Sequence, residues 1–136
     1  MVEVFEHTAD IGLRVRAADL NGLFADAARG LFGLIVENLA DVRPTQAEQI
    51  QVEGTHREFL LFDWLNELLY RFDTRHFVCS EFKVTLTATG LDAKVRGEPL
   101  DPSRHRLDHE VKAITYHELK VEQSPEGWLA EVIVDI

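Results

Sequence analysis

A short polar segment near the N-terminus holds the first side chains that could do chemistry. Residues 7–12 read His-Thr-Ala-Asp-Ile-Gly, which places a histidine, a hydroxyl and an acid between two stretches with strand character. These residues could form a functional site. They could equally form a polar turn, in which Asp10 bonds its own backbone and Gly12 eases the corner. Spacing alone leaves both interpretations open.

The C-terminus is the second such feature, because an apolar strand runs to the last residue. Residues 132–136 read Val-Ile-Val-Asp-Ile, whereas a chain end more often trails off into polar residues. Asp135 and the main-chain carboxylate of Ile136 place two negative charges side by side, and a hard cation such as Ca²⁺ or Mg²⁺ prefers oxygen ligands of this kind. A solvated chain end is the alternative. Zinc is disfavoured, since no nitrogen or sulfur cluster has suitable spacing.

Residues 98–117 form the third feature, a segment rich in titratable groups. Such loops often carry function, but no pair here has the spacing of a nucleophile and its base. Each of the six histidines is as readily explained as a surface or core residue. The roles of His7, Arg104, His105, Lys112 and His117 therefore stay open. The polar residues of this segment are Glu98, Asp101, Arg104, His105, His109, Glu110, Lys112, Thr115, Tyr116 and His117.

Length and composition predict one intracellular domain spanning residues 1–136. The chain is 46% hydrophobic and 28% charged, an ordinary globular balance. Its single cysteine, Cys79, cannot form an internal disulfide, which favours a reducing cytoplasm. The N-terminus carries acids and no basic segment, so we expect no signal peptide. No stretch approaches the roughly 20 apolar residues that span a bilayer, so we expect no membrane association.

The net charge of the chain limits the classes of partner that it can bind. With 24 acids against 14 bases the formal charge is −10, which disfavours direct tight binding to nucleic acid. An acidic body suits a basic protein partner, a cation or plain solubility. Asp63, Asn66, Glu67 and Tyr70 share one polar side of a predicted helix, which is either an acidic docking surface or a solvated face. Phosphate loops, zinc knuckles and nucleophile elbows, the usual signatures of a stand-alone enzyme, are absent from the sequence.

The elements that must position these residues follow from hydrophobic periodicity. Asp19 is the expected N-cap of the first helix. Thr55 and Glu58 have the spacing of a capping box at the second. The Ser-Pro-Glu-Gly run at 124–127 predicts a turn. We therefore expect an α+β fold with one mainly antiparallel sheet and two helices packed on one face. The expected strands lie at about 2–6, 11–17, 48–53, 82–88, 91–95, 112–122 and 128–134, and the helices at about 20–37 and 56–73.

Four of these segments, in order and over nearly the whole chain, resemble the archease family. They are residues 5–12, the helix at 60–70, the stretch from 97–98 through 110–117, and the ending at 132–136. Residues 38–50 and 120–128 carry little family signal.

The resemblance implies a small acidic accessory protein without a catalytic cycle of its own. Archeases assist the GTP-dependent RNA ligase of tRNA splicing and RNA repair, promoting its guanylylation and multiple turnover. The resemblance also implies a bound cation, usually calcium, held by Asp10, Asp135 and the terminal carboxylate of Ile136. His7 and Thr8 would be its neighbours. We hypothesise that this site, or the polar loop from Glu98 to Lys112, presents carboxylates to the ligase active site.

Other functions stay open beside this one. Some archeases are linked to tRNA cytosine methyltransferases, so a chaperone or specificity modulator of such an enzyme is the first alternative. The second is a small metal-dependent phosphodiester hydrolase, in which Asp10, Asp135 and His117 activate a water. The third is a structural metal site on an interaction module. The sequence settles neither the in-cell partner, nor the identity of the cation, nor the oligomeric state.

Overall fold

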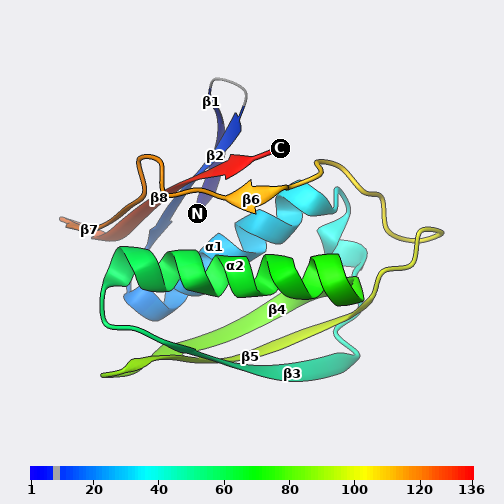
Figure 1. Ribbon diagram of the computed structural model, residues 1–136, viewed down its shortest axis with the longest axis horizontal. Helices are drawn as coiled ribbons and strands as arrows, with labels where there is room; N and C mark the ends of the chain where they lie inside the picture. The colour runs from blue at the N-terminus through cyan, green and yellow to red at the C-terminus, as the bar shows by residue number, and fades with distance from the viewer. Residues whose placement is uncertain (8–9) are drawn as a thin grey trace.

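Two antiparallel sheets enclose a layer of two helices in the computed structural model, which describes residues 1–7 and 10–136 (Figure 1). One sheet has the strand order β1-β2-β8-β6, with β7 also paired to β8, and the other has the order β3-β5-β4. The helices are α1 (Leu20–Ile35) and α2 (Arg57–Arg75), with a short 3-10 turn at Leu39–Asp41. The strands are β1 (Val2–His7), β2 (Asp10–Ala17), β3 (Gln46–Glu53), β4 (Phe77–Leu86), β5 (Gly90–Pro99), β6 (Ala113–Ile114), β7 (Lys120–Ser124) and β8 (Gly127–Asp135).

The α+β class is confirmed, but the strands divide between two sheets instead of forming one. The reason lies in α1, which packs against β2 and β8 on one side and β4 on the other. Its buried residues are Leu23, Phe24, Ala27, Ala28, Gly30, Leu31, Phe32, Leu34 and Ile35, which is more than one stripe. A helix that is apolar over so much of its surface must be covered on two sides.

The helix ends agree with the sequence at one cap and not at the other. The Asp19 carboxylate accepts a hydrogen bond from the Gly22 amide at 2.7 Å, which confirms the predicted N-cap of α1. The predicted capping box of α2 is wrong, because His56 is the N-cap and no side chain caps the helix. Within the described residues, neither helix is long and apolar enough to cross a membrane.

The second half of the chain is more divided than its periodicity predicts. The expected strand at 112–122 is two short strands, β6 and β7, separated by a turn at 115–119. The strand expected at 91–95 runs on to Pro99, into the segment expected as a polar loop. The turn at 124–127 is confirmed, with Ser124 paired to Gly127. Gly127 has φ +142°, a conformation that L side chains rarely adopt.

Trp64 joins the two helices at the centre of the core. Its side chain is fully buried on α2, and its Nε1–H donates to the backbone oxygen of Phe24 on α1 at 3.0 Å. A buried indole needs a partner for its N–H, and here the neighbouring helix supplies one. The spacing of α1 and α2 thus depends on a directional contact as well as on packing.

Replacing Trp64 with Phe should lower the free energy of unfolding by about 1–3 kcal/mol, because a buried hydrogen bond and ring volume are lost. Urea denaturation measures the change. Trp128→Phe is the matched control: Trp128 is half-exposed beneath the Arg57 guanidinium, so its loss should cost clearly less. Equal losses in the two variants would contradict this role for Trp64.

Candidate metal centre at the β2–β8 ladder

The antiparallel pairing of β2 with β8 brings two of the predicted ligands together. Asp10 lies directly opposite Asp135 in this ladder. Side chains of directly opposed residues leave the same face of a sheet, with Cβ atoms about 4.5–5.5 Å apart. The neighbouring pair, Ile11 with Val134, faces the core. The two carboxylates therefore share the outer face of this sheet, away from the helices.

The end of the chain is held beside this pair. Ile136 follows Asp135 directly, and its half-buried side chain packs against the core. The Lys112 amide donates to the backbone oxygen of Asp135 at 2.8 Å, and Ala113 of β6 lies opposite Asp135 on the other side. Asp135 is thus paired on both edges of β8. The terminal carboxylate therefore directly follows a strand that is hydrogen-bonded on both edges.

The outer face next to the aspartates is closed by an aromatic ring. Phe5 of β1 lies opposite Gly12, and a Cβ atom on Gly12 would come within 2.1 Å of Phe5 Cζ. The Arg14 guanidinium stacks on the same ring at 4.6 Å and donates to Glu131 at 2.6 Å. Glycine leaves room for this ring, and a larger residue at position 12 would have to displace it. The Arg14 guanidinium also lies 3.5 Å from Glu3 of β1, so it is shared by two acids of this face.

The donor set fits a hard divalent cation. Like charges directly opposite in a ladder repel, and a cation bound between them would remove that repulsion. Two aspartates and a terminal carboxylate offer only oxygen ligands, as calcium and magnesium prefer, and waters would fill the remaining positions. Among the described residues, no group of three or more His, Cys, Asp or Glu side chains could hold a metal. A cation site at this ladder would therefore need the terminal carboxylate beside the two aspartates. Thr8 and the side chain of His7 lie outside the described residues.

Comparison with known proteins decides the family. A model of the archease protein family matches residues 3–136. The chain belongs to the archease family. The archease of Pyrococcus abyssi is 42% identical to it, over 98% of this chain and 97% of the relative. The archease of Methanopyrus kandleri is 41% identical, over 98% of each.

Solved structures agree with this archease fold. The solution structure of protein 1598 from Methanobacterium thermoautotrophicum has a TM-score of 0.86 at 31% identity, over 99% of this chain and 98% of that one. A crystal structure from Thermotoga maritima, described as an archease and possible chaperone, has a TM-score of 0.70 at 20% identity, over 100% and 98%. The second likeness concerns the fold alone.

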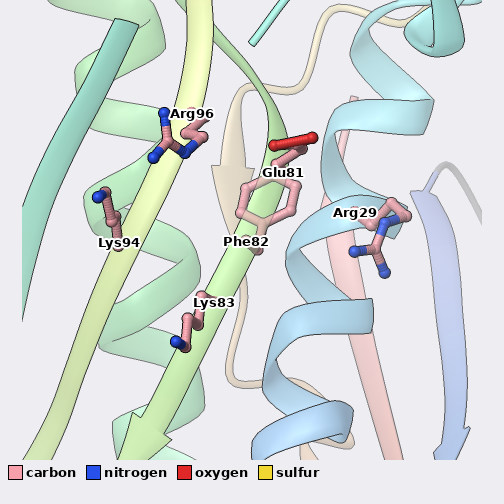
Figure 2. A pocket seen from close by; sticks show the side chains of 6 residues that line it. All are labelled: Arg29, Glu81, Phe82, Lys83, Lys94 and Arg96. Atoms are coloured by element: carbon pink, nitrogen blue, oxygen red, sulfur yellow. The ribbon is translucent and has the colours of Figure 1, made fainter.

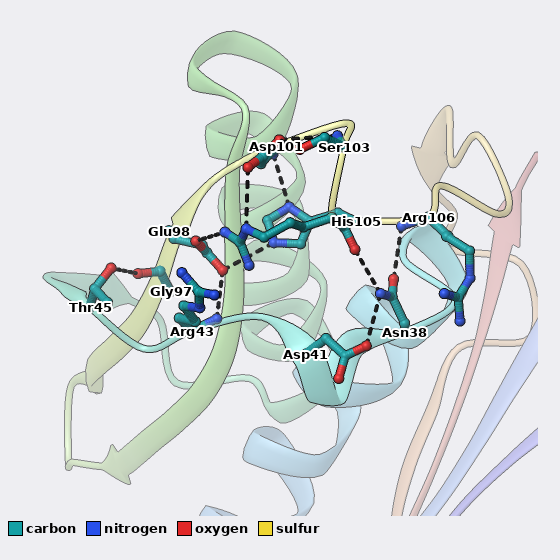
Figure 3. Close-up of polar contacts among 11 residues, drawn as sticks. Asn38, Asp41, Arg43, Thr45, Gly97, Glu98, Asp101, Ser103, His105 and Arg106 are labelled. Carbon is teal, nitrogen blue, oxygen red and sulfur yellow. Dashed lines mark hydrogen bonds and ion pairs between the residues drawn. The ribbon is translucent and has the colours of Figure 1, made fainter.

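A second polar cluster in this archease has a buried centre and organises the loop after β5 (Figure 3). The Glu98 carboxylate accepts from the Arg43 amide at 2.6 Å and from the Arg104 guanidinium, and it contacts His105 Nε2 at 3.0 Å. The Asp101 amide donates to His105 Nδ1 at 2.9 Å, so Nε2 carries the proton that goes to Glu98. Asn38 joins the loop to the end of α1 through the Arg104 oxygen and the Arg106 amide, each at 2.8 Å.

These contacts give Arg104 and His105 a structural role, and they exclude Glu98 from the carboxylates that the 98–112 loop could present. Glu98 and His105 are buried, with relative exposures of 7% and 2%, so neither faces a partner. Glu98 therefore does not present its carboxylate to a ligase, because Arg104, His105 and the Arg43 amide already bind both carboxylate oxygens. The sequence could not reveal this network, since the Arg43 contact is made by a backbone amide 55 residues away along the chain.

The structure gives positions for the remaining candidate residues but assigns them no role. His117 lies in the exposed turn after β6, with Nε2 3.7 Å from Glu118 Oε1. Its role beside the two aspartates stays a prediction. The predicted acidic face of α2 lines a groove of about 630 Å³ against β3, with Glu67 held by Arg71 at 2.8 Å. The groove residues are Gln51, Val52, Glu53, Asp63, Asn66, Glu67 and Tyr70.

The Glu98 cluster predicts a loss of stability in acid. Burial alone would raise the pKa of Glu98, but the Arg43 amide, Arg104 and His105 outweigh it and lower the pKa from 4.5 to about 2. Because the folded pKa lies below the unfolded value, the stabilisation is present above pH 4.5 and is lost as the pH falls through about 2. Glu98→Gln should flatten the dependence of unfolding free energy on pH in this window.

Denaturant unfolding at a series of pH values tests this. Glu53→Gln is the control, because Glu53 is an exposed acid at the end of β3. It should leave the acid-induced loss intact. If the Glu98→Gln protein had the same pH profile as the wild type, Glu98 would not be the source of the acid-induced loss of stability.

Proposed function

We propose that this protein is a non-catalytic cofactor of the GTP-dependent RNA ligase of tRNA splicing and RNA repair. It would promote guanylylation of the ligase and so allow multiple turnover, in the cytoplasm. The observation that carries the proposal is the family match over residues 3–136, together with the directly opposed Asp10 and Asp135. These are the two side chains that the archease resemblance assigns to a cation.

The site residues would act by charge. Asp10, Asp135 and the terminal carboxylate of Ile136 would together hold Ca²⁺, or another hard cation such as Mg²⁺. When bound, the ion neutralises part of the site and fixes the three carboxylates relative to one another. The carboxylates carry three negative charges against two positive ones, so the rim stays anionic. An anionic rim on an exposed sheet face attracts a cationic group of a partner protein.

The buried titratable groups support an accessory role. Glu98 is held as a carboxylate by its partners, and His105 is fixed in one tautomer between Glu98 and the Asp101 amide. Burial raises the pKa of Cys79 to about 12, which removes its thiol as a nucleophile at neutral pH. None of these three is poised to transfer a proton or attack a substrate. Their contacts serve the fold.

The acidic surface supports docking to a basic protein. The chain carries a formal charge of −10, and the groove between α2 and β3 adds Glu53, Asp63 and Glu67 to the acids of the β2–β8 ladder. A ligase that handles RNA needs basic surfaces, which match this charge. The groove is the second surface through which the proposed complex could form.

Ligation of RNA under multiple-turnover conditions tests the proposed function. Wild-type protein should raise the number of turnovers per ligase. Asp10→Asn, Asp135→Asn and a C-terminal extension beyond Ile136 should each remove most of the stimulation. Urea denaturation without divalent cations shows whether each variant is as stable as the wild type. Loss of stimulation would then report on the site and not on the fold.

Glu126→Gln is the matched control, because it removes one exposed carboxylate from the β7–β8 turn. It should stimulate ligation like the wild type. Added chelator should mimic the aspartate variants, provided that the ligase itself is supplied with the ions it needs. Wild-type protein that leaves ligase turnover unchanged would refute the proposed function. Full stimulation by the C-terminally extended protein would refute the role of the terminal carboxylate.

A further inference from the structure

A basic pocket lies on the other sheet, in a protein that is acidic overall. Figure 2 shows its lining residues, which come from β4, β5 and α1. The pocket has a volume of about 470 Å³. Four of the lining side chains are cationic and only one is acidic. The lining residues are Arg29, Glu81, Phe82, Lys83, Lys94 and Arg96.

The strand register concentrates the positive charge. Lys83 of β4 lies directly opposite Lys94 of β5, and Arg96 lies opposite Glu81. Residues 83 and 94 therefore leave the same face of the sheet, and residue 96 joins them because strand side chains alternate. Lys83 and Lys94 repel each other in this arrangement. A bound anion between the two lysines would remove this repulsion.

Among the described residues, three of these cations form no close ion pair, although Glu81 lies opposite Arg96 in the ladder. Most arginines elsewhere in the chain pair with acids, as Arg14 does with Glu131 and Arg71 with Glu48. Within the part of the chain that the structure describes, Lys83, Lys94 and Arg96 form no ion pair within 4.0 Å. Arg29 is the exception in the pocket, because it pairs with Asp26 at 2.5 Å. The three remaining cations are therefore available to an external anion.

Protection of a sheet edge explains only one of them. Lysines on edge strands deter pairing with other chains, and β4 is an edge strand of its sheet. Lys94 and Arg96 lie on β5, which is paired on both sides by β3 and β4. A central strand needs no such protection. Edge protection therefore does not account for Lys94 and Arg96.

We propose that this pocket binds phosphate groups of the RNA strand on which the ligase acts, an inference that rests on the proposed function. Guanidinium and ammonium groups are the side chains that contact phosphates. Lys94 and Arg96 are two residues apart on one strand, about 6.6–6.8 Å along it. That separation is comparable to the distance between successive phosphates of a single strand. The net charge of the chain disfavours tight RNA binding. The local cluster of Lys83, Lys94 and Arg96 still allows weak contact with RNA.

Amide chemical-shift titration of the protein alone tests the pocket without the ligase. The probe is an RNA hairpin with single-stranded tails, titrated at several salt concentrations. Shifts should concentrate on β4 and β5. In Lys83→Gln/Lys94→Gln, binding should weaken, and the slope of log K against log salt should become shallower by about 1.4, at roughly 0.7 per phosphate for single strands. The same spectra show whether the variant is folded.

Arg16→Gln/Arg106→Gln is the matched control, because it removes two exposed charges far from the pocket in sequence. It changes the net charge equally and should leave the slope unaltered. Equal weakening in both double variants, or no shifts with RNA, would overturn the inference. Shifts on the same amides with guanosine triphosphate but not with RNA would also overturn it, assigning the pocket to the nucleotide. Because no ligase is present, these results are independent of whether the protein stimulates ligation.

Discussion

The pairing of β2 with β8 is the constraint on which the site depends. Eight residue pairs run from Ala17 opposite Trp128 to Asp10 opposite Asp135. A slip by one residue would turn every side chain of β8 to the other face and bury Asp135. The core-facing Ile11, Leu13 and Val15 of β2 disfavour such a slip. At the far end a Cβ on Gly127 would come within 2.3 Å of the Ala17 oxygen, which fixes where β8 begins. The terminal carboxylate is thus placed by sheet geometry.

Two charged features lie on opposite layers of this fold. The opposed aspartates lie on the outer face of one sheet, and the unpaired Lys83, Lys94 and Arg96 belong to the other, with both helices between (Figure 1). A net charge of −10 hides this separation. Interaction with a protein at one face and with phosphates at the other would let one small domain contact a ligase and its substrate together. The buried Glu98 cluster serves neither face and holds the connecting loop in place.

Local chemistry made part of this structure predictable from sequence. Asp19 caps α1 as expected, because its carboxylate needs only the amide three residues on. The strands were found because alternation survives in a half-buried ladder. The pairing of the strands is not predictable in this way, because periodicity does not say which strands are neighbours. The structure therefore has two sheets where the sequence predicts one. The Glu98 cluster and the Lys83–Lys94 pair depend on contacts distant in sequence. The family resemblance predicts that Asp10 and Asp135 belong to one site. The strand register places them opposite each other.

The central claim is that the chain's own terminus completes a cation site with Asp10 and Asp135. Crystals grown with calcium, or with terbium as an anomalous substitute, test it most directly. We expect an anomalous peak bound by both aspartates and the Ile136 carboxylate, with calcium–oxygen distances of about 2.3–2.6 Å. The peak should be absent from Asp135→Asn crystals. A wild-type structure with no ion there, or with the ion bound elsewhere, would contradict the account.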